Sequence, residues 1–99
     1  MLISDDRLYI VAYDIANPRR WRRVFKTMNA YGEWLQLSVF QCRLSRRRRA
    51  ELETRLRALV KNDEDHVLLI DVGPAGKTKL AVESIGKTFS SIERRATVI

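Results

Sequence analysis

Residues 8–13 read Leu-Tyr-Ile-Val-Ala-Tyr, and Asp14 follows them directly. A run that is apolar throughout, with no polar alternation, is typical of a central β-strand that is covered on at least one face. Asp14 ends this predicted strand. A helix is predicted next, because Asn17 is a good N-cap, Pro18 suits the first helical turn, and apolar residues then recur at helical spacing. The pattern stops near Gly32.

Residues 33–44 carry strong strand propensity. They predict either one long strand or two short strands with a hinge near Ser38, and both alternatives stay open. Ser45 is the N-cap of a second predicted helix that continues to about Lys61. Its apolar stripe, with opposite charges four residues apart on the outside, is typical of an amphipathic helix.

Residues 66–72 form the second strongly apolar strand, and residues 80–86 and 96–99 are weaker strand candidates. This order of elements predicts one domain over residues 1–99, of the α+β class. We expect a two-layer sandwich in which two helices cover one face of a mostly antiparallel sheet.

The second face of this sheet is predicted to be bare, because two helices cannot cover four or five strands on both sides. We expect a second copy of the chain to bury it, which makes the protein a homodimer. The core of each domain is expected within about residues 8–72. The segment of about residues 80–99 is expected to take part in the dimer.

Cys42 is the single cysteine, so an intramolecular disulfide is impossible and a reducing compartment, the cytoplasm, is expected. No apolar run approaches the roughly 20 residues that span a bilayer. Asp5 and Asp6, close to the first residue, do not fit the layout of a signal peptide. Neither export nor contact with a membrane is expected.

The net charge of +7 is unevenly distributed along the chain. Residues 1–50 hold eleven Lys or Arg against four Asp or Glu, whereas residues 51–99 hold eight of each kind. A basic surface of this kind favours polyanions through phosphate neutralisation and counterion release. Nucleic acid is therefore the expected partner, and a surface charged only for solubility is the alternative.

Asp14 is a candidate metal ligand, because it lies just past the end of a buried strand and beside the basic start of the first helix. Magnesium commonly takes only one or two protein carboxylates, with water and substrate completing its shell. A two-fold axis near this strand end would bring two copies of Asp14 together. The alternative is a strand-ending aspartate that accepts backbone hydrogen bonds.

Two groups of basic residues are candidates for phosphate contacts. The first lies on the polar side of the first predicted helix and comprises Arg19, Arg20, Arg22, Arg23 and Lys26. The second opens the second predicted helix and comprises Arg46, Arg47, Arg48 and Arg49. Four cations in a first helical turn oppose the helix dipole, so an anion such as phosphate is expected beside them. A solvated helix face is the alternative for the first group.

Other features have simpler explanations. Residues 73–78, Gly-Pro-Ala-Gly-Lys-Thr, lack the glycine spacing and the following helix of a phosphate-binding loop, so we predict a tight turn. Cys42 is predicted to pack in the core, and His66 to cap a strand or lie on the surface. Trp21 and Trp34 are expected to pack in the core rather than stack on bases.

Three segments resemble the CRISPR-associated protein 2 family, the small partner of the spacer integrase. They are residues 8–15, the Arg-rich segment that ends in Tyr31-Gly32, and residues 36–42, Gln-Leu-Ser-Val-Phe-Gln-Cys. The resemblance implies a ferredoxin-like fold and a homodimer in which the C-terminal strand of each subunit completes the other's sheet. It also implies that the dimer bridges two integrase dimers along a DNA duplex during spacer acquisition.

Members of this family are described as metal-dependent endonucleases of single-stranded RNA or double-stranded DNA. The resemblance implies that Asp14 is the ligand of Mg²⁺, with Mn²⁺ as a substitute. The neighbours that the motif match carries over are Tyr13, Arg20, Arg22, Ser38 and Phe40. Gln41 departs from the family pattern, because glutamate is common at this position.

The resemblance implies an antiviral defence protein, for which two functions are open. The first is hydrolysis of a phosphodiester by a metal-activated water, with two Asp14 carboxylates holding the ion and arginines stabilising the developing charge. The second is a noncatalytic scaffold that clamps a DNA duplex for the integrase. A single carboxylate and a basic surface serve both functions.

Overall fold

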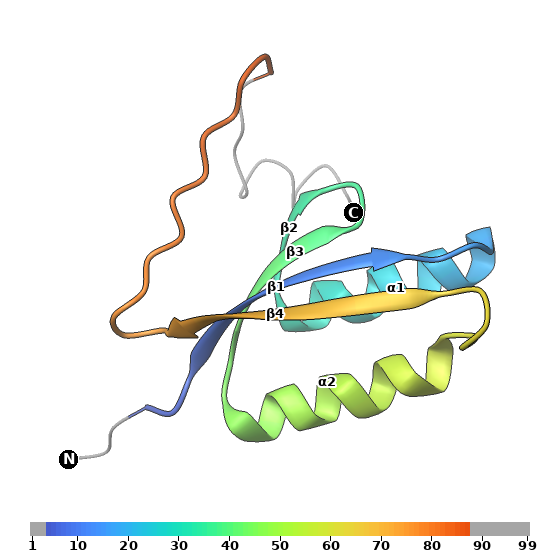
Figure 1. Ribbon diagram of the computed structural model, residues 1–99, viewed down its shortest axis with the longest axis horizontal. Helices are drawn as coiled ribbons and strands as arrows, with labels where there is room; N and C mark the ends of the chain where they lie inside the picture. Colours follow the sequence, from blue (N-terminus) through green and yellow to red (C-terminus); the bar gives the residue numbers. More distant parts are fainter. Residues whose placement is uncertain (1–3, 88–99) are drawn as a thin grey trace.

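The computed structural model describes residues 4–87, which form a four-stranded sheet and two helices (Figure 1). In chain order the elements are β1 (Arg7–Asp14), α1 (Pro18–Tyr31), β2 (Glu33–Gln36), β3 (Val39–Leu44), α2 (Arg46–Leu59) and β4 (His66–Pro74). The α+β class predicted from the sequence is confirmed. Within residues 4–87, no helix is long and apolar enough to cross a membrane.

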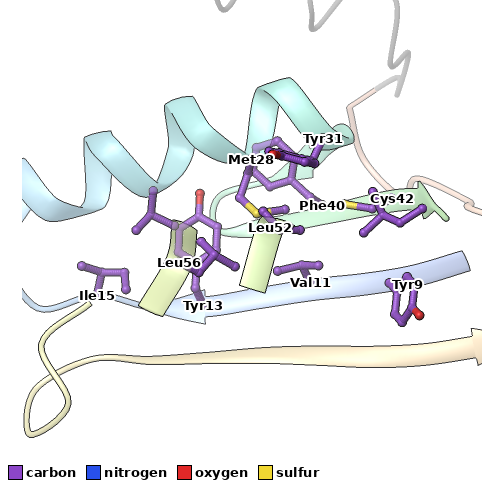
Figure 2. Packing of buried hydrophobic residues seen from close by; sticks show 12 residues of the cluster. Tyr9, Val11, Tyr13, Ile15, Met28, Tyr31, Phe40, Cys42, Leu52 and Leu56 are labelled. Atoms are coloured by element: carbon purple, nitrogen blue, oxygen red, sulfur yellow. The ribbon is translucent and has the colours of Figure 1, made fainter. Parts of the chain in front are cut away.

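The strands lie in the order β2-β3-β1-β4, and every neighbouring pair is antiparallel. The most apolar strand, β1, is therefore central, as its composition predicts. Its alternate residues Tyr9, Val11 and Tyr13 are buried. Figure 2 shows the buried cluster between the sheet and the helices, to which α1 contributes Met28 and α2 contributes Leu52.

The opposite face of the sheet carries no helix within the described part of the chain. Leu68 and Ile70 of β4 point to this face and are 47% and 48% exposed. Ile70 lies opposite Ile10 of β1, so the exposed side chains are continuous with those of the central strand. The prediction that the helices leave one face bare is confirmed, and its burial by a second copy remains a prediction.

Residues 33–44 form two strands rather than one. Gln36 of β2 pairs with Val39 of β3, so Leu37 and Ser38 alone make the turn. Leu37 adopts a positive φ of 41° and is 74% exposed. Positive φ is costly for a bulky side chain and is usually given to Gly, Asn or Asp, which explains why the sequence left this hinge undecided.

Both helices begin at the predicted caps. The Asn17 side chain accepts hydrogen bonds from the backbone amides of Arg19 and Arg20, at 2.9 and 3.1 Å. The Ser45 hydroxyl accepts one from the amide of Arg48 at 3.1 Å. These bonds satisfy amides that have no partner inside the helix.

The end of β4 differs from the expectation. The strand continues to Pro74 instead of ending at Val72. Residues 75–77 then form the predicted turn, in which the amide of Lys77 donates to the carbonyl of Pro74 at 3.1 Å. No helix follows up to residue 87, so the loop has none of the architecture of a nucleotide-binding loop.

Residues 80–86, a weak strand candidate, form no strand within the single chain, and their pairing with a second copy remains a prediction. After β4 the chain leaves the sheet as an extended segment (orange in Figure 1), so no neighbouring strand of the described chain is available for pairing. The predicted strand over residues 96–99 lies outside the described residues.

Candidate metal and nucleic-acid site

Asp14 is the last residue of β1, and its side chain is exposed. Its Cα lies opposite that of His66, the first residue of β4. Because Tyr13 points into the core, the alternation along the strand places Asp14 on the helix-free face. Within residues 4–87 the Asp14 carboxylate makes no hydrogen bond or ion pair, so its oxygens are available to a ligand.

One chain supplies only part of a metal site. No group of three or more His, Cys, Asp or Glu side chains that could hold an ion occurs among the described residues. Asp14 offers one hard oxygen donor group, which suits Mg²⁺ because this ion often binds through one or two protein carboxylates and keeps several waters. The donor set therefore fits Mg²⁺ as one half of a site that two chains would share.

Tyr13 and Phe40 lie behind Asp14, in the core. They are 6% and 0% exposed, and their rings stack with centroids 6.3 Å apart. Burial raises the pKa of the Tyr13 hydroxyl above its usual value, and this oxygen has no hydrogen-bond partner of normal geometry. Such buried side chains have little or no surface with which to touch a substrate.

Ser38 connects the β2–β3 turn to the end of β1. Its carbonyl accepts a hydrogen bond from the amide of Tyr13 at 3.1 Å, and its hydroxyl accepts one from Trp21 Nε1 at 2.8 Å. Trp34 Nε1 donates to the carbonyl of Leu37 at 3.0 Å. Both tryptophans also pack against the core, as predicted. This bonding keeps the turn beside the strand end that carries Asp14.

Four cations of α1 lie exposed and make no ion pair with any described residue. They are Arg19, Arg22, Arg23 and Lys26. The helix has no acidic residue, so the positive charge on this surface is not neutralised locally. We call these four side chains the α1 patch. The patch belongs to the helix that follows Asp14 in the chain, and its side chains can bind phosphate groups.

Arg20 differs from the α1 patch because it is held by acidic side chains. Its Nε donates to Asp65 Oδ2 at 2.8 Å, and its Nη2 donates to Asp65 Oδ1 at 3.2 Å and to Glu64 Oε1 at 3.0 Å. The Asp65 side chain is fully buried. Asp65 could not be recognised from the sequence, since an aspartate in a polar loop gives no local sign of a partner 45 residues away.

The arginine run of α2 divides into two pairs. Arg46 has no ion pair with a described residue, and Arg47 is largely exposed with a long 3.8 Å contact to Glu51. Arg48 donates to the carbonyl of Ala30 at 3.1 Å and lies 4.6 Å above the Tyr31 ring. These contacts of Arg48 are structural and connect α2 to the end of α1.

Arg49 completes this run and is also occupied. It pairs with Glu53 at 3.3 Å and lies 5.5 Å from the centre of the Tyr9 ring. A glutamate and aromatic rings of the same chain therefore contact Arg48 and Arg49, where the sequence predicted a bound phosphate. Arg46 and Arg47 remain the members of the run that are open to a ligand.

Cys42 and His66 have the surroundings that their sequence context predicts, and Gln41 joins two strands. Cys42 is 1% exposed, and burial raises the pKa of its thiol to about 12, which makes it an unreactive core residue. His66 is exposed at the start of β4. Gln41 Nε2 donates to Glu33 Oε1 at 2.6 Å across β2 and β3, a bond that a glutamate at position 41 could not donate.

The fold and the site together define a class of small α+β sandwich domains that carry an exposed carboxylate at the end of a central strand, beside a basic helix. Within this class the chain belongs to the CRISPR associated protein Cas2 family, whose model matches residues 7–79. The resemblance found in the sequence is therefore confirmed.

Two relatives share more than half of their residues with the chain. The CRISPR-associated endoribonuclease Cas2 1 of Rhodospirillum rubrum is 55% identical over 94 residues, which cover 95% of this chain and 92% of the relative. The CRISPR-associated endoribonuclease Cas2 of Geobacter sulfurreducens is 56% identical over 94 residues, covering 95% of this chain and 99% of the relative. The similarity thus extends over almost the whole of each protein.

Solved structures agree with the fold. A hypothetical protein from Thermus thermophilus matches with a TM-score of 0.71 and 34% identity, covering 84% of this chain and 96% of that one. A crystal structure of Cas2 matches with a TM-score of 0.70 and 38% identity, covering 86% and 94% of the two chains. These matches support the ferredoxin-like arrangement expected from the resemblance.

Proposed function

We propose that this protein is a metal-dependent endonuclease of a CRISPR system that cleaves RNA as a homodimer. The observation that carries the proposal is the free, exposed carboxylate of Asp14 at the end of the central strand. The endoribonuclease names of the two relatives above favour RNA over double-stranded DNA as the substrate.

The helix-free face supports the homodimer. Leu68 and Ile70 expose apolar surface there, and Asp14 lies on the same face at the end of the neighbouring strand. Contiguous apolar surface of this kind is commonly an interface. If a second copy packs on this face about a two-fold axis near the end of β1, two Asp14 carboxylates approach one another and one divalent ion can relieve their repulsion.

Asp14 of each copy would hold Mg²⁺ or Mn²⁺ through its carboxylate oxygens. A bound ion of this kind lowers the pKa of its water and polarises a phosphoryl oxygen. The α1 patch would bind other phosphates of the nucleic acid. Tyr13, Phe40 and Ser38 would fix the strand end from behind.

A second function is supported by the α1 patch itself. Four cations on one helix, with no ion pair to residues 4–87, suit the regular phosphate spacing of a nucleic-acid duplex and need no metal. A noncatalytic role would therefore be a scaffold that clamps DNA and bridges integrase dimers during spacer acquisition. Loss of Asp14 would leave this role intact.

Cleavage assays with the purified dimer separate these functions. Single-stranded RNA and a DNA duplex of matched length are each incubated with Mg²⁺, Mn²⁺ or excess chelator. The nuclease function predicts cleavage of RNA with either metal and none with chelator. Binding of the duplex with no cleavage of either substrate, over a range of pH and metal concentration, would leave the scaffold function alone.

A further inference from the structure

The backbone that follows Asp14 is held by one buried carboxylate. Asp65 Oδ1 accepts a hydrogen bond from the amide of Ala16 at 3.0 Å, and Ala16 is two residues beyond Asp14. Asp65 Oδ2 accepts one from the amide of Lys61 at 2.8 Å, just after α2. The same two oxygens receive Arg20 from the first turn of α1. Asp65 therefore connects the turn after β1, the start of α1 and the end of α2.

The position of Asp65 in the chain adds a further constraint. The next residue is His66, whose Cα lies opposite that of Asp14. The Asp65 carboxylate thus holds the end of β1, which carries Asp14, through its hydrogen bond to Ala16. The backbone of Asp65 leads directly into β4, the strand that pairs with β1. The Asp65 side chain has no exposed surface, and that of Arg20 is only 20% exposed. Two oxygens facing a fixed guanidinium fork allow little change of orientation.

We propose that Arg20 and Asp65 are positioning residues, whose ion pair fixes the turn after β1 and so holds the Asp14 carboxylate where two copies can share a divalent ion. This inference rests on the proposed function of Asp14. Arg20 is then no phosphate contact, in contrast to the prediction from its place among the arginines of α1. Its fork is already occupied by Asp65 and Glu64.

Arg20→Lys and Asp65→Asn test the pair, because a phosphate contact and a positioning residue predict different effects on the affinity for Mn²⁺. Asp65→Asn removes the charge that holds Arg20 and frees its guanidinium. If Arg20 binds phosphate, the variant keeps the natural affinity for Mn²⁺ and binds RNA as well as the natural protein or more tightly. If Arg20 and Asp65 position Asp14, RNA binding stays the same while the affinity for Mn²⁺ falls.

The measurements are Mn²⁺ affinity by isothermal titration, kcat and KM for RNA cleavage, and amide hydrogen exchange at Ala16. We expect each variant to lose about tenfold in Mn²⁺ affinity, within the range for residues that orient a metal ligand. We also expect kcat to fall with KM unchanged, and exchange at Ala16 to become faster. If Asp65→Asn fails to fold, Arg20→Lys carries the test, since lysine keeps the charge but not the fork.

Asp71→Asn is the matched control. Asp71 also joins β4 to an arginine of β1, because Arg7 Nε donates to its two oxygens at 3.0 and 2.9 Å, but this exposed pair lies at the other end of the strands. The control is expected to keep the Mn²⁺ affinity of the natural protein. Natural Mn²⁺ affinity in a folded Arg20→Lys variant, or a raised KM with kcat unchanged, would overturn the positioning role.

Asp14→Asn in the same titration separates the two proposals. Loss of Mn²⁺ binding in Asp14→Asn, with natural binding in Arg20→Lys and Asp65→Asn, refutes only the positioning pair. Undiminished Mn²⁺ binding in Asp14→Asn refutes the proposed metal site, and the positioning inference with it.

Discussion

Asp14 and His66 face each other across the antiparallel pairing of β1 and β4, and both lie on the side of the sheet that carries no helix. Along the same ladder, Ala12 lies opposite Leu68 and Ile10 lies opposite Ile70, each pair two residues beyond the one before it. The candidate metal ligand and the exposed apolar residues are therefore parts of one surface. Burial of that surface by a second chain and assembly of the metal site are expected to occur together.

Ile70→Asp should weaken the dimer by at least about tenfold, because an apolar side chain at the interface contributes on the order of 1.5 kcal/mol and a carboxylate would be desolvated. Sedimentation velocity across a range of protein concentrations measures the dissociation constant. Thr54→Asp, on the exposed surface of α2, is the control and should leave it unchanged. An Ile70→Asp variant that is dimeric at the same concentrations as the natural protein would exclude this face as the interface.

Neutralising the α1 patch should flatten the salt dependence of RNA binding. Replacing all four cations by glutamine should lower the slope of log K against log salt by as much as about 3, since each phosphate contact on a single strand contributes about 0.7. Fluorescence anisotropy at several salt concentrations gives the slope. An unaltered slope would mean that the patch is only a solvated helix face.

The arginine run of α2 should give two different phenotypes. Replacing Arg46 and Arg47 by glutamine should lower the salt slope without changing stability, because neither side chain is firmly held. Arg48→Gln should instead cost about 1 kcal/mol in the free energy of unfolding, since it removes a hydrogen bond and a cation–π contact. If the Arg46 and Arg47 replacement and Arg48→Gln had equal effects on RNA binding and on stability, the division of the run into open and structural arginines would be contradicted.

Gly32→Ala should destabilise the fold by about 1 to 3 kcal/mol, which is the usual cost of overpacking. A Cβ at this position would overlap Cys42 Sγ and lie 2.5 Å from the carbonyl oxygen of Gln41. The Gln41 carbonyl is part of the backbone, so it cannot move aside as a flexible side chain can. Gly76→Ala is the control, because a Cβ there meets nothing within 4 Å. Urea unfolding checks both variants, and equal stability would show that the sheet yields at Gly32.

Local patterns in the sequence predict most of the helices and strands of the fold. The apolar run of β1 and the caps Asn17 and Ser45 each act within a few residues, so they could be recognised directly. The turn at Leu37 could not, because its positive φ is imposed by the pairing of two strands on a residue that normally avoids it. The segment 80–86 has strand-like composition but no neighbouring strand among the described residues, and composition alone cannot supply one.

The candidate site shows the same limit. Asp14 could be singled out because a carboxylate directly after an apolar strand is a local signal. Arg20 was grouped with its neighbours on α1, since its charge is visible in the sequence but its partner is not. Among residues 4–87, Arg20 is held in an ion pair and Arg22 is not, because Asp65 lies beside Arg20 only once the chain has folded.

Stability should depend on pH through Asp65. The Arg20 guanidinium, with the backbone amides of Lys61 and Ala16, holds the pKa of Asp65 well below its usual range. A lowered pKa means that Asp65 stabilises the folded state above its unfolded-state pKa of about 3.9, and that this contribution is lost progressively as the pH falls below that value.

Urea unfolding between pH 7 and pH 3 measures this contribution. Asp65→Asn should be less stable than the natural protein at neutral pH, and the difference should shrink as the pH falls below about 4. Asp71→Asn again serves as the control. A difference between Asp65→Asn and the natural protein that stays constant over this range would show that the charge of Asp65 does not stabilise the fold.

Asp14→Asn tests the central claim most directly, because the substitution keeps the size of the side chain and removes the charge that a hard cation requires. The measurement is the rate of RNA cleavage by the purified dimer in Mg²⁺ and in Mn²⁺, with RNA affinity measured in parallel. We predict that cleavage is lost in both metals while the dimer and its RNA affinity are retained. Cleavage by Asp14→Asn at the natural rate, in a preparation that a chelator still inactivates, would show that the metal is held elsewhere and would contradict the account.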